Sequence, residues 1–84
     1  MQLLYFAWVR QSIGTGSEQK KLPENVTNVA GVIDWLRHEG EGYAEAFRDV
    51  DQIKFAVNQI FVSLEAPVKD SDEVAFFPPV TGVR

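Results

Sequence analysis

The sequence predicts an α+β domain in which one main helix packs on one face of a mixed sheet of four or five short strands. Two observations support this fold class: apolar and aromatic runs that have the length of strands, and a single stripe of apolar residues with helical spacing. A helix with one apolar face must bury it against another element, here the sheet. The 84 residues, of which 45% are hydrophobic, suit one small globular domain.

The first strand is predicted at residues 3–9, an apolar and aromatic run bounded by polar residues. Gly14 and Gly16 then indicate a turn, because the stretch lacks the Gly-Lys-Ser/Thr sequence of a phosphate-binding loop. Residues 18–22 are a weaker candidate for a second strand that returns along the first. Because the first strand is the most apolar, we expect it to lie centrally in the sheet.

The main helix is predicted where apolar residues recur at positions i, i+3, i+4 and i+7, namely at Val29, Val32, Ile33 and Leu36. Thr27 or Asn28 can cap its N-terminus, and Gly40 and Gly42 are expected to end it. Residues 43–49 are expected to form one further short helical turn.

Two paired strands are predicted at residues 54–58 and 60–64, on either side of Asn58-Gln59. The stretch KDSDE is typical of a turn and precedes the final strand, residues 73–77. One helix with strands in this order suits a β-grasp fold.

The C-terminal residues have the character of a tail. Pro78 and Pro79 cannot continue a strand and direct the chain away from the sheet as a stiff spacer, and Gly82 lets the backbone enter a narrow site in almost any conformation. Residues 1–77 are therefore expected to form the domain and residues 78–84 a flexible tail. Such a tail can deliver its own carboxyl group, with a frayed terminus as the alternative.

The composition excludes several kinds of site. The chain has no cysteine, which excludes disulfides, thiolate zinc sites, cysteine-ligated iron–sulfur clusters and a cysteine nucleophile. A net charge of −4 argues against nucleic acid and serves mostly solubility, with a basic protein partner as the alternative. No apolar run approaches the ~20 residues that span a bilayer, and the first ten residues lack the features of a signal peptide. We expect a cytoplasmic protein that binds neither nucleic acid nor membrane.

Side chains that commonly carry catalysis are sparse. His38 is the only histidine, and we expect a surface role for it near the end of the helix. Asp70 and Asp72 are typical of turn chemistry and supply too few oxygen ligands for a metal ion. No evident base could activate the serines, which are Ser12, Ser17, Ser63 and Ser71. Alone, the chain lacks the residues of an enzyme, and we expect it to bind no cofactor or metal.

Strand alternation places several aromatic side chains on the sheet face that points away from the helix. The inward set is Leu3, Tyr5, Ala7, Val9, Ile60, Val62, Leu64, Val74 and Phe76. The outward set is Leu4, Phe6, Trp8, Phe61, Ser63 and Phe77. A solvent-facing sheet is ordinarily polar. Either loops or the helical turn at residues 43–49 cover these side chains, or the register is shifted by one residue, or the face is an apolar patch for a protein partner.

Three stretches resemble the small, sulfur-carrier subunit of molybdopterin synthase, a ubiquitin-like protein. They are LLYFAWVR, AVNQIFVS and, most specifically, DSDEVAFFPPVTG. The resemblance runs from the first strand to Gly82, and the helix region between matches in pattern only.

The resemblance implies a ubiquitin-like β-grasp fold whose tail is the reactive element. In this family an E1-like enzyme uses ATP to adenylate the C-terminal glycine carboxylate, which becomes a thiocarboxylate. The tail enters the large synthase subunit, and two sulfur deliveries convert cyclic pyranopterin monophosphate into molybdopterin. The large subunit carries the catalytic side chains, in a heterotetramer with two copies of each subunit.

The family's partner contacts correspond to the residues Phe6, Phe61, Phe77, Pro78, Pro79, Val80 and Thr81. Its reactive end is Gly-Gly, of which Gly82 matches the first glycine, whereas Val83 replaces the second and Arg84 is additional. A chain with this end is expected to dock without donating sulfur. The alternatives in function are a ubiquitin-like protein modifier or binding module, and the sulfur carrier of the thiamine pathway.

Overall fold

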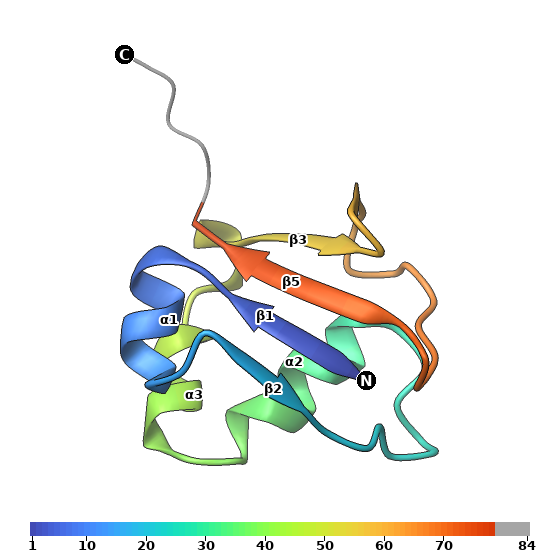
Figure 1. The fold of residues 1–84 in the computed structure, drawn as a ribbon, viewed down its shortest axis with the longest axis horizontal. Helices are drawn as coiled ribbons and strands as arrows, with labels where there is room; N and C mark the ends of the chain where they lie inside the picture. Colours follow the sequence, from blue (N-terminus) through green and yellow to red (C-terminus); the bar gives the residue numbers. More distant parts are fainter. Residues whose placement is uncertain (79–84) are drawn as a thin grey trace.

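Five strands form one mixed sheet in the computed structural model, which describes residues 1–78 (Figure 1). Their order across the sheet is β2-β1-β5-β3-β4. Strands β1 and β5 run parallel, and the other neighbours are antiparallel. The bounds are Gln2–Tyr5 for β1, Ser17–Gln19 for β2, Lys54–Val57 for β3, Ile60–Phe61 for β4 and Glu73–Phe77 for β5.

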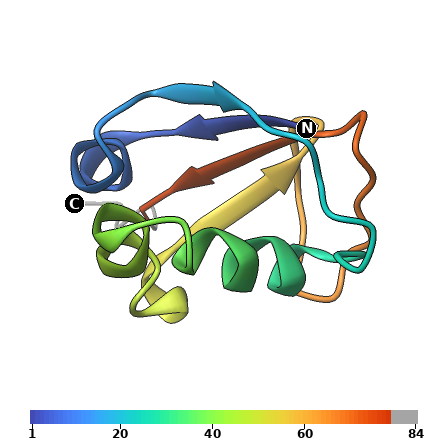
Figure 2. The ribbon, with the colours of Figure 1, turned by 90° about the horizontal axis from the view of Figure 1, so that it is seen from below.

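Helices cover one face of the sheet. Figure 2 shows α2 and α3 on the same side, with α1 at one end of the sheet. The bounds are Ala7–Ile13 for α1, Val29–Arg37 for α2 and Glu41–Ala46 for α3. A 3₁₀ turn, η1, spans Val50–Gln52. Within residues 1–78, no helix covers the other face of the sheet.

The hydrophobic core lies between the sheet and α2. The predicted helical stripe is confirmed, since its four apolar side chains are buried. Strands β1 and β5 contribute Leu3, Tyr5, Val74 and Phe76, all with 1% exposure or less. The inward positions predicted in these two strands are therefore correct. Strand β1 is internal, as expected, but β5 occupies the middle of the sheet, between β1 and β3.

The predicted first strand is too long. Strand β1 ends at Tyr5, and Ala7, Trp8 and Val9 belong to α1 instead. Ala7 has a φ of 53°, a left-handed backbone conformation that turns the chain out of the sheet and into the helix. Val9 is buried from the helix rather than from a strand. A short apolar run fits either element, and here the local turn decides.

The structure shows which of the two predicted residues caps the N-terminus of α2. The side chain of Asn28 accepts a hydrogen bond from the N–H of Gly31 at 2.8 Å, so Asn28 and not Thr27 is the cap. The end differs from the prediction, because α2 stops at Arg37 and Gly42 lies inside α3. The short helical turn expected at residues 43–49 is this helix, which begins two residues earlier.

Gly42 allows α3 to lie against the backbone of α1. A Cβ at this position would be too close to the carbonyl oxygen of Ser12. Gly42→Ala is expected to lower the free energy of unfolding by about 1–3 kcal/mol through overpacking. Helix propensity alone predicts the opposite effect, because alanine favours a helix over glycine and would raise the free energy of unfolding by about 1 kcal/mol. Urea unfolding measures which effect wins, and a gain in stability would show that the two helices are less tightly packed.

The predicted pair of strands around Asn58-Gln59 is confirmed, with β4 shorter than expected. Both turn residues have positive φ, 51° and 72°, as a tight hairpin turn requires. The side-chain amide of Asn58 donates to Asp72 and its oxygen accepts from the N–H of Glu73, which fixes the turn against the start of β5. Asp72 also accepts from the N–H of Lys69, the turn chemistry predicted for this stretch.

One inward position of the late strands is wrong. Ile60 is 67% exposed, because it follows the hairpin turn directly on a two-residue edge strand. Val62 and Leu64 are partly buried against the core, as expected. Residues 18–22, the weaker candidate strand, correspond to β2, which pairs antiparallel with β1 and begins one residue earlier.

Candidate functional site

Three phenylalanine rings gather on the sheet face without helices, and we call them the aromatic patch: Phe6, Phe61 and Phe77. Phe77 lies between the other two, with ring centroids 5.5 Å from Phe6 and 5.4 Å from Phe61. Phe6 is 44% exposed and Phe61 is 65% exposed, whereas Phe77 is partly buried. The outward position predicted for all three is correct, and within residues 1–78 no loop or helix buries Phe6 and Phe61.

The register of the sheet explains why the rings meet. On β5, alternation turns Phe76 into the core and Phe77 outward. Ala56 of β3 is paired with Ala75 on one side and with Phe61 on the other. The small side chains of Ala56 and Ala75 leave a hollow of about 350 Å³ next to the rings. Leu4 and Glu73 also line this hollow. Sequence reasoning missed the alanines, which lower the floor of the patch.

Phe6 reaches the patch through the turn that begins α1. Its N–H donates to the carbonyl of Phe76 at 3.1 Å, so its backbone continues the pairing of β1 with β5. The left-handed backbone of Ala7 then turns the chain away. Trp8, which was expected on the same face, is instead on α1 and lines a separate hollow with Glu45 and Arg48. Trp8 is therefore not part of the patch.

The patch adjoins the place where the tail begins. Strand β5 ends at Phe77, and Pro78 follows it directly. The other predicted site residues of the tail lie outside the residues that the structure describes: Pro79, Val80, Thr81 and Gly82. Val83 and Arg84 also lie outside them. The aromatic patch thus stands immediately before the predicted reactive segment.

The polar side chains for which the sequence predicted surface or turn roles are not brought together. The ring of His38 is exposed at the end of α2, where its Nδ1 contacts the carbonyl of Asp34 at 2.8 Å. Asp70 accepts hydrogen bonds from the N–H of Leu22 and from the terminal ammonium of Met1, and these hold the pKa of its carboxyl group below the usual value. Within residues 1–78, no three His, Asp or Glu side chains lie close enough to share a metal ion.

A cluster around Glu18 was not anticipated from the sequence. The Glu18 carboxylate accepts hydrogen bonds from the hydroxyls of Tyr5, at 2.9 Å, and Tyr43, at 2.6 Å. Burial, with the Glu18 charge in addition, raises the pKa of Tyr5 and raises that of Tyr43 to about 12. Both hydroxyls therefore stay protonated as donors, and the cluster joins β1, β2 and α3 rather than forming a reactive site.

The sequence model of the ThiS family matches residues 3–82. The chain belongs to the ThiS family. A relative in Haemophilus influenzae, a molybdopterin synthase sulfur carrier subunit, is 37% identical over 82 residues, which cover 98% of each chain. In this ThiS family chain, the aromatic patch is an apolar surface that lies outside the core, at the end of β5.

Two solved structures confirm the ubiquitin-like β-grasp fold that the sequence predicts. SAMP1 from Haloferax volcanii has a TM-score of 0.73 at 23% identity, covering 99% of this chain and 98% of that one. A Helicobacter pylori complex of subunits 1 and 2 of molybdopterin-converting factor contains a chain with a TM-score of 0.64 at 22% identity, covering 98% and 96%. That complex pairs the fold with a partner subunit. Among residues 1–78, no helix is long and apolar enough to cross a membrane.

Proposed function

We propose that this chain is the sulfur-carrier subunit of a molybdopterin synthase. In this role it delivers sulfur, as a C-terminal thiocarboxylate, to cyclic pyranopterin monophosphate during molybdenum cofactor biosynthesis. The observation that carries the proposal is the match over nearly the whole chain to a subunit of that name. The aromatic patch directly before the tail supports it, because a carrier must dock before its end can react.

The chain's own part in the reaction is to bind and to present its C-terminus. An E1-like enzyme adenylates the terminal carboxylate with ATP, and a sulfur donor then replaces the adenylate to give the thiocarboxylate. The chain itself binds no cofactor in this scheme, and Gly82 marks the reactive end. The scattered positions of His38, Asp70 and Asp72 fit a division of labour in which the large subunit supplies the catalytic side chains.

The proposed partner for the aromatic patch is the large synthase subunit, within a heterotetramer that has two copies of each subunit. Exposed aromatic rings that are fixed by their neighbours are typical of the residues that dominate binding energy. The residues of the tail, Pro78, Pro79, Val80 and Thr81, would then enter the large subunit from the edge of this contact. The Helicobacter pylori complex supports such a pairing for this fold.

The alternatives are a protein modifier and a sulfur carrier of the thiamine pathway. The fold shared with SAMP1, a small archaeal modifier protein, favours the first, and the ThiS family match leaves room for the second. Neither explains the 37% identity to a molybdopterin synthase subunit as directly.

The test uses a version of the chain that ends in Gly82-Gly and carries a thiocarboxylate. It is mixed with a large synthase subunit and cyclic pyranopterin monophosphate, and molybdopterin is measured as its fluorescent oxidation product. We expect molybdopterin to form in proportion to the thiocarboxylate consumed. Consumption with no molybdopterin, together with attachment of the chain to lysines of other proteins, would favour the modifier instead.

A further inference from the structure

A groove lies beside the aromatic patch, where β4 diverges from β3. The backbone N–H of Asn58 donates to the backbone carbonyl of Glu73 on β5. Because hydrogen-bonded positions alternate along an antiparallel strand, the backbone groups of Ala56 and Lys54 also point toward β5. Those of Phe55 point the other way, toward β4. The N–H of Val62 donates to the carbonyl of Phe55 at 3.2 Å. The reciprocal bond, from the N–H of Phe55 to the carbonyl of Val62, is absent. Within residues 1–78, no side chain accepts a hydrogen bond from this N–H either.

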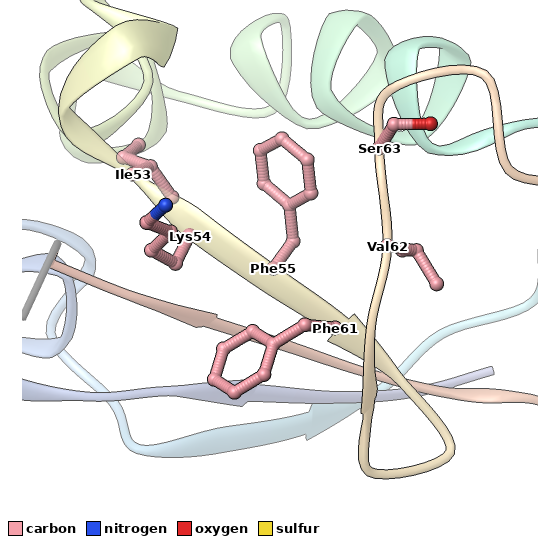
Figure 3. Close-up of a pocket in the computed structure, with 6 residues that line it drawn as sticks. All are labelled: Ile53, Lys54, Phe55, Phe61, Val62 and Ser63. Atoms are coloured by element: carbon pink, nitrogen blue, oxygen red, sulfur yellow. The ribbon is translucent and has the colours of Figure 1, made fainter.

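Figure 3 shows the segment that carries Phe61, Val62 and Ser63 running away from β3. The groove between them has a volume of about 540 Å³ and is lined by Ile53, Lys54, Phe55, Phe61, Val62 and Ser63. Its walls are largely hydrocarbon, with one cation. Lys54 is exposed, and within residues 1–78 it makes no ion pair with a carboxylate.

The groove is continuous with the patch because Phe61 lines both hollows. Three partly exposed phenylalanine rings offer roughly 300 Å² of contact, whereas a stable interface buries about 800 Å² on each partner. A partner that covers the patch must therefore extend onto neighbouring surface. The groove is neighbouring surface that combines an apolar wall with an available backbone donor.

We infer that the groove binds an extended segment of the large synthase subunit, which rests on the function proposed above. The segment adds to the edge of β3 and gives a backbone carbonyl to the N–H of Phe55. It places an apolar side chain between Ile53 and Val62 and a carboxylate beside Lys54. A chain with a net charge of −4 repels acidic segments in general, so this lone cation sets where along the edge the carboxylate can lie.

The backbone bond is tested by amide hydrogen exchange on the full chain, alone and with the large subunit. We expect the Phe55 amide to exchange at least tenfold more slowly in the complex. Unchanged exchange in a saturated complex would overturn the inference. Slowing in the free chain that grows with its concentration would also overturn it, because a second copy would then be the occupant.

The charge contact is tested with Lys54→Glu, which is expected to weaken binding to the large subunit by about tenfold or more. The matched control is Lys69→Glu, another exposed lysine without an ion pair in the described part of the chain, which lies away from the patch. Melting temperatures confirm that both variants fold. Equal effects of the two would overturn the inference while leaving the proposed function in place, provided that the unaltered chain binds. Failure of the unaltered chain to bind would count against the proposed function itself.

Discussion

Replacing Phe77 by alanine is expected to weaken binding to the large synthase subunit by about 30-fold or more while the domain stays folded. Truncation of a central interface aromatic commonly costs about 2 kcal/mol or more, which corresponds to about 30-fold in the dissociation constant. Phe77 is the central ring of the aromatic patch, since it contacts both Phe6 and Phe61. Isothermal titration calorimetry with the large subunit measures the loss, and thermal unfolding of the free chain measures stability.

Phe76 provides the matched control, because it is the same residue type one position earlier on the same strand. Its side chain is fully buried and packs against Tyr5 and Phe47, with ring centroids at 6.0 Å and 5.0 Å. Phe76→Ala is expected to cost about 3–5 kcal/mol of folding stability, a large share of what a domain of this size has. If Phe77→Ala unfolds the free chain in the same way, without a separate loss of binding, then Phe77 is a core residue and the patch is misinterpreted.

The contrast between these neighbours was accessible from the sequence because β5 obeys simple alternation. A run of five residues between a turn and two prolines leaves little freedom in register, so Phe76 inward and Phe77 outward followed directly. The stripe in α2 was predictable for a similar reason, since one period of apolar residues fits one buried face. In both elements the local pattern and the tertiary packing agree.

The first apolar run shows where local pattern is insufficient. Leu3 and Tyr5 alternate as a strand, but Val9 and Ile13 are spaced as a helix, and the run itself contains no glycine or proline that separates them. The break comes at Ala7, whose left-handed backbone is unfavourable for alanine and is held by packing of α1 against α3. Gly42, which permits that packing, lies far away in the sequence. Trp8 was therefore assigned to the wrong surface.

The aromatic patch was predicted as a set of residues, but its shape was not. Alternation identified Phe6, Phe61 and Phe77 without showing that Ala56 and Ala75 lie beneath them, because that depends on the pairing of β3 with β5. The groove beside Lys54 depends on where β4 leaves β3. No local signal marks that point, since residues 60–64 read as a strand throughout.

A chain that ends in Val83-Arg84 is expected to dock on the large subunit normally yet to donate no measurable sulfur. Neither residue is among those that form the patch or line the groove, so the contacts proposed for docking on these surfaces are unchanged. The reacting carboxyl group, however, is carried one residue past a Gly-Gly end, which is roughly 3.5 Å in an extended chain, and two residues, or roughly 7 Å, past Gly82. Displacing a reacting group by about 1 Å can already cost ~100-fold in rate.

The side chains of Val83 and Arg84 also oppose entry of the tail into a narrow site, in addition to the length that these residues add. Val83 is β-branched, which excludes the left-handed conformations open to glycine and adds bulk where a narrow site must close around the backbone. Arg84 carries a permanent charge whose burial is costly unless a partner compensates it. Length, shape and charge therefore all act in the same direction, against entry of the tail into an activating or catalytic site.

The measurement supplies the E1-like enzyme, ATP and a sulfur source, and then reads the intact mass for replacement of one terminal oxygen by sulfur. A chain rebuilt to end in Gly82-Gly is the control, and it is expected to be thiocarboxylated. Val83→Gly with Arg84 retained separates the effect of the side chain at position 83 from that of the added length. Equal thiocarboxylation and equal molybdopterin formation by the unaltered and rebuilt chains, with Val83-Arg84 still present in the mass, would contradict the prediction. Loss of the two residues before sulfur appears would instead show that removing them is what exposes a reactive glycine end.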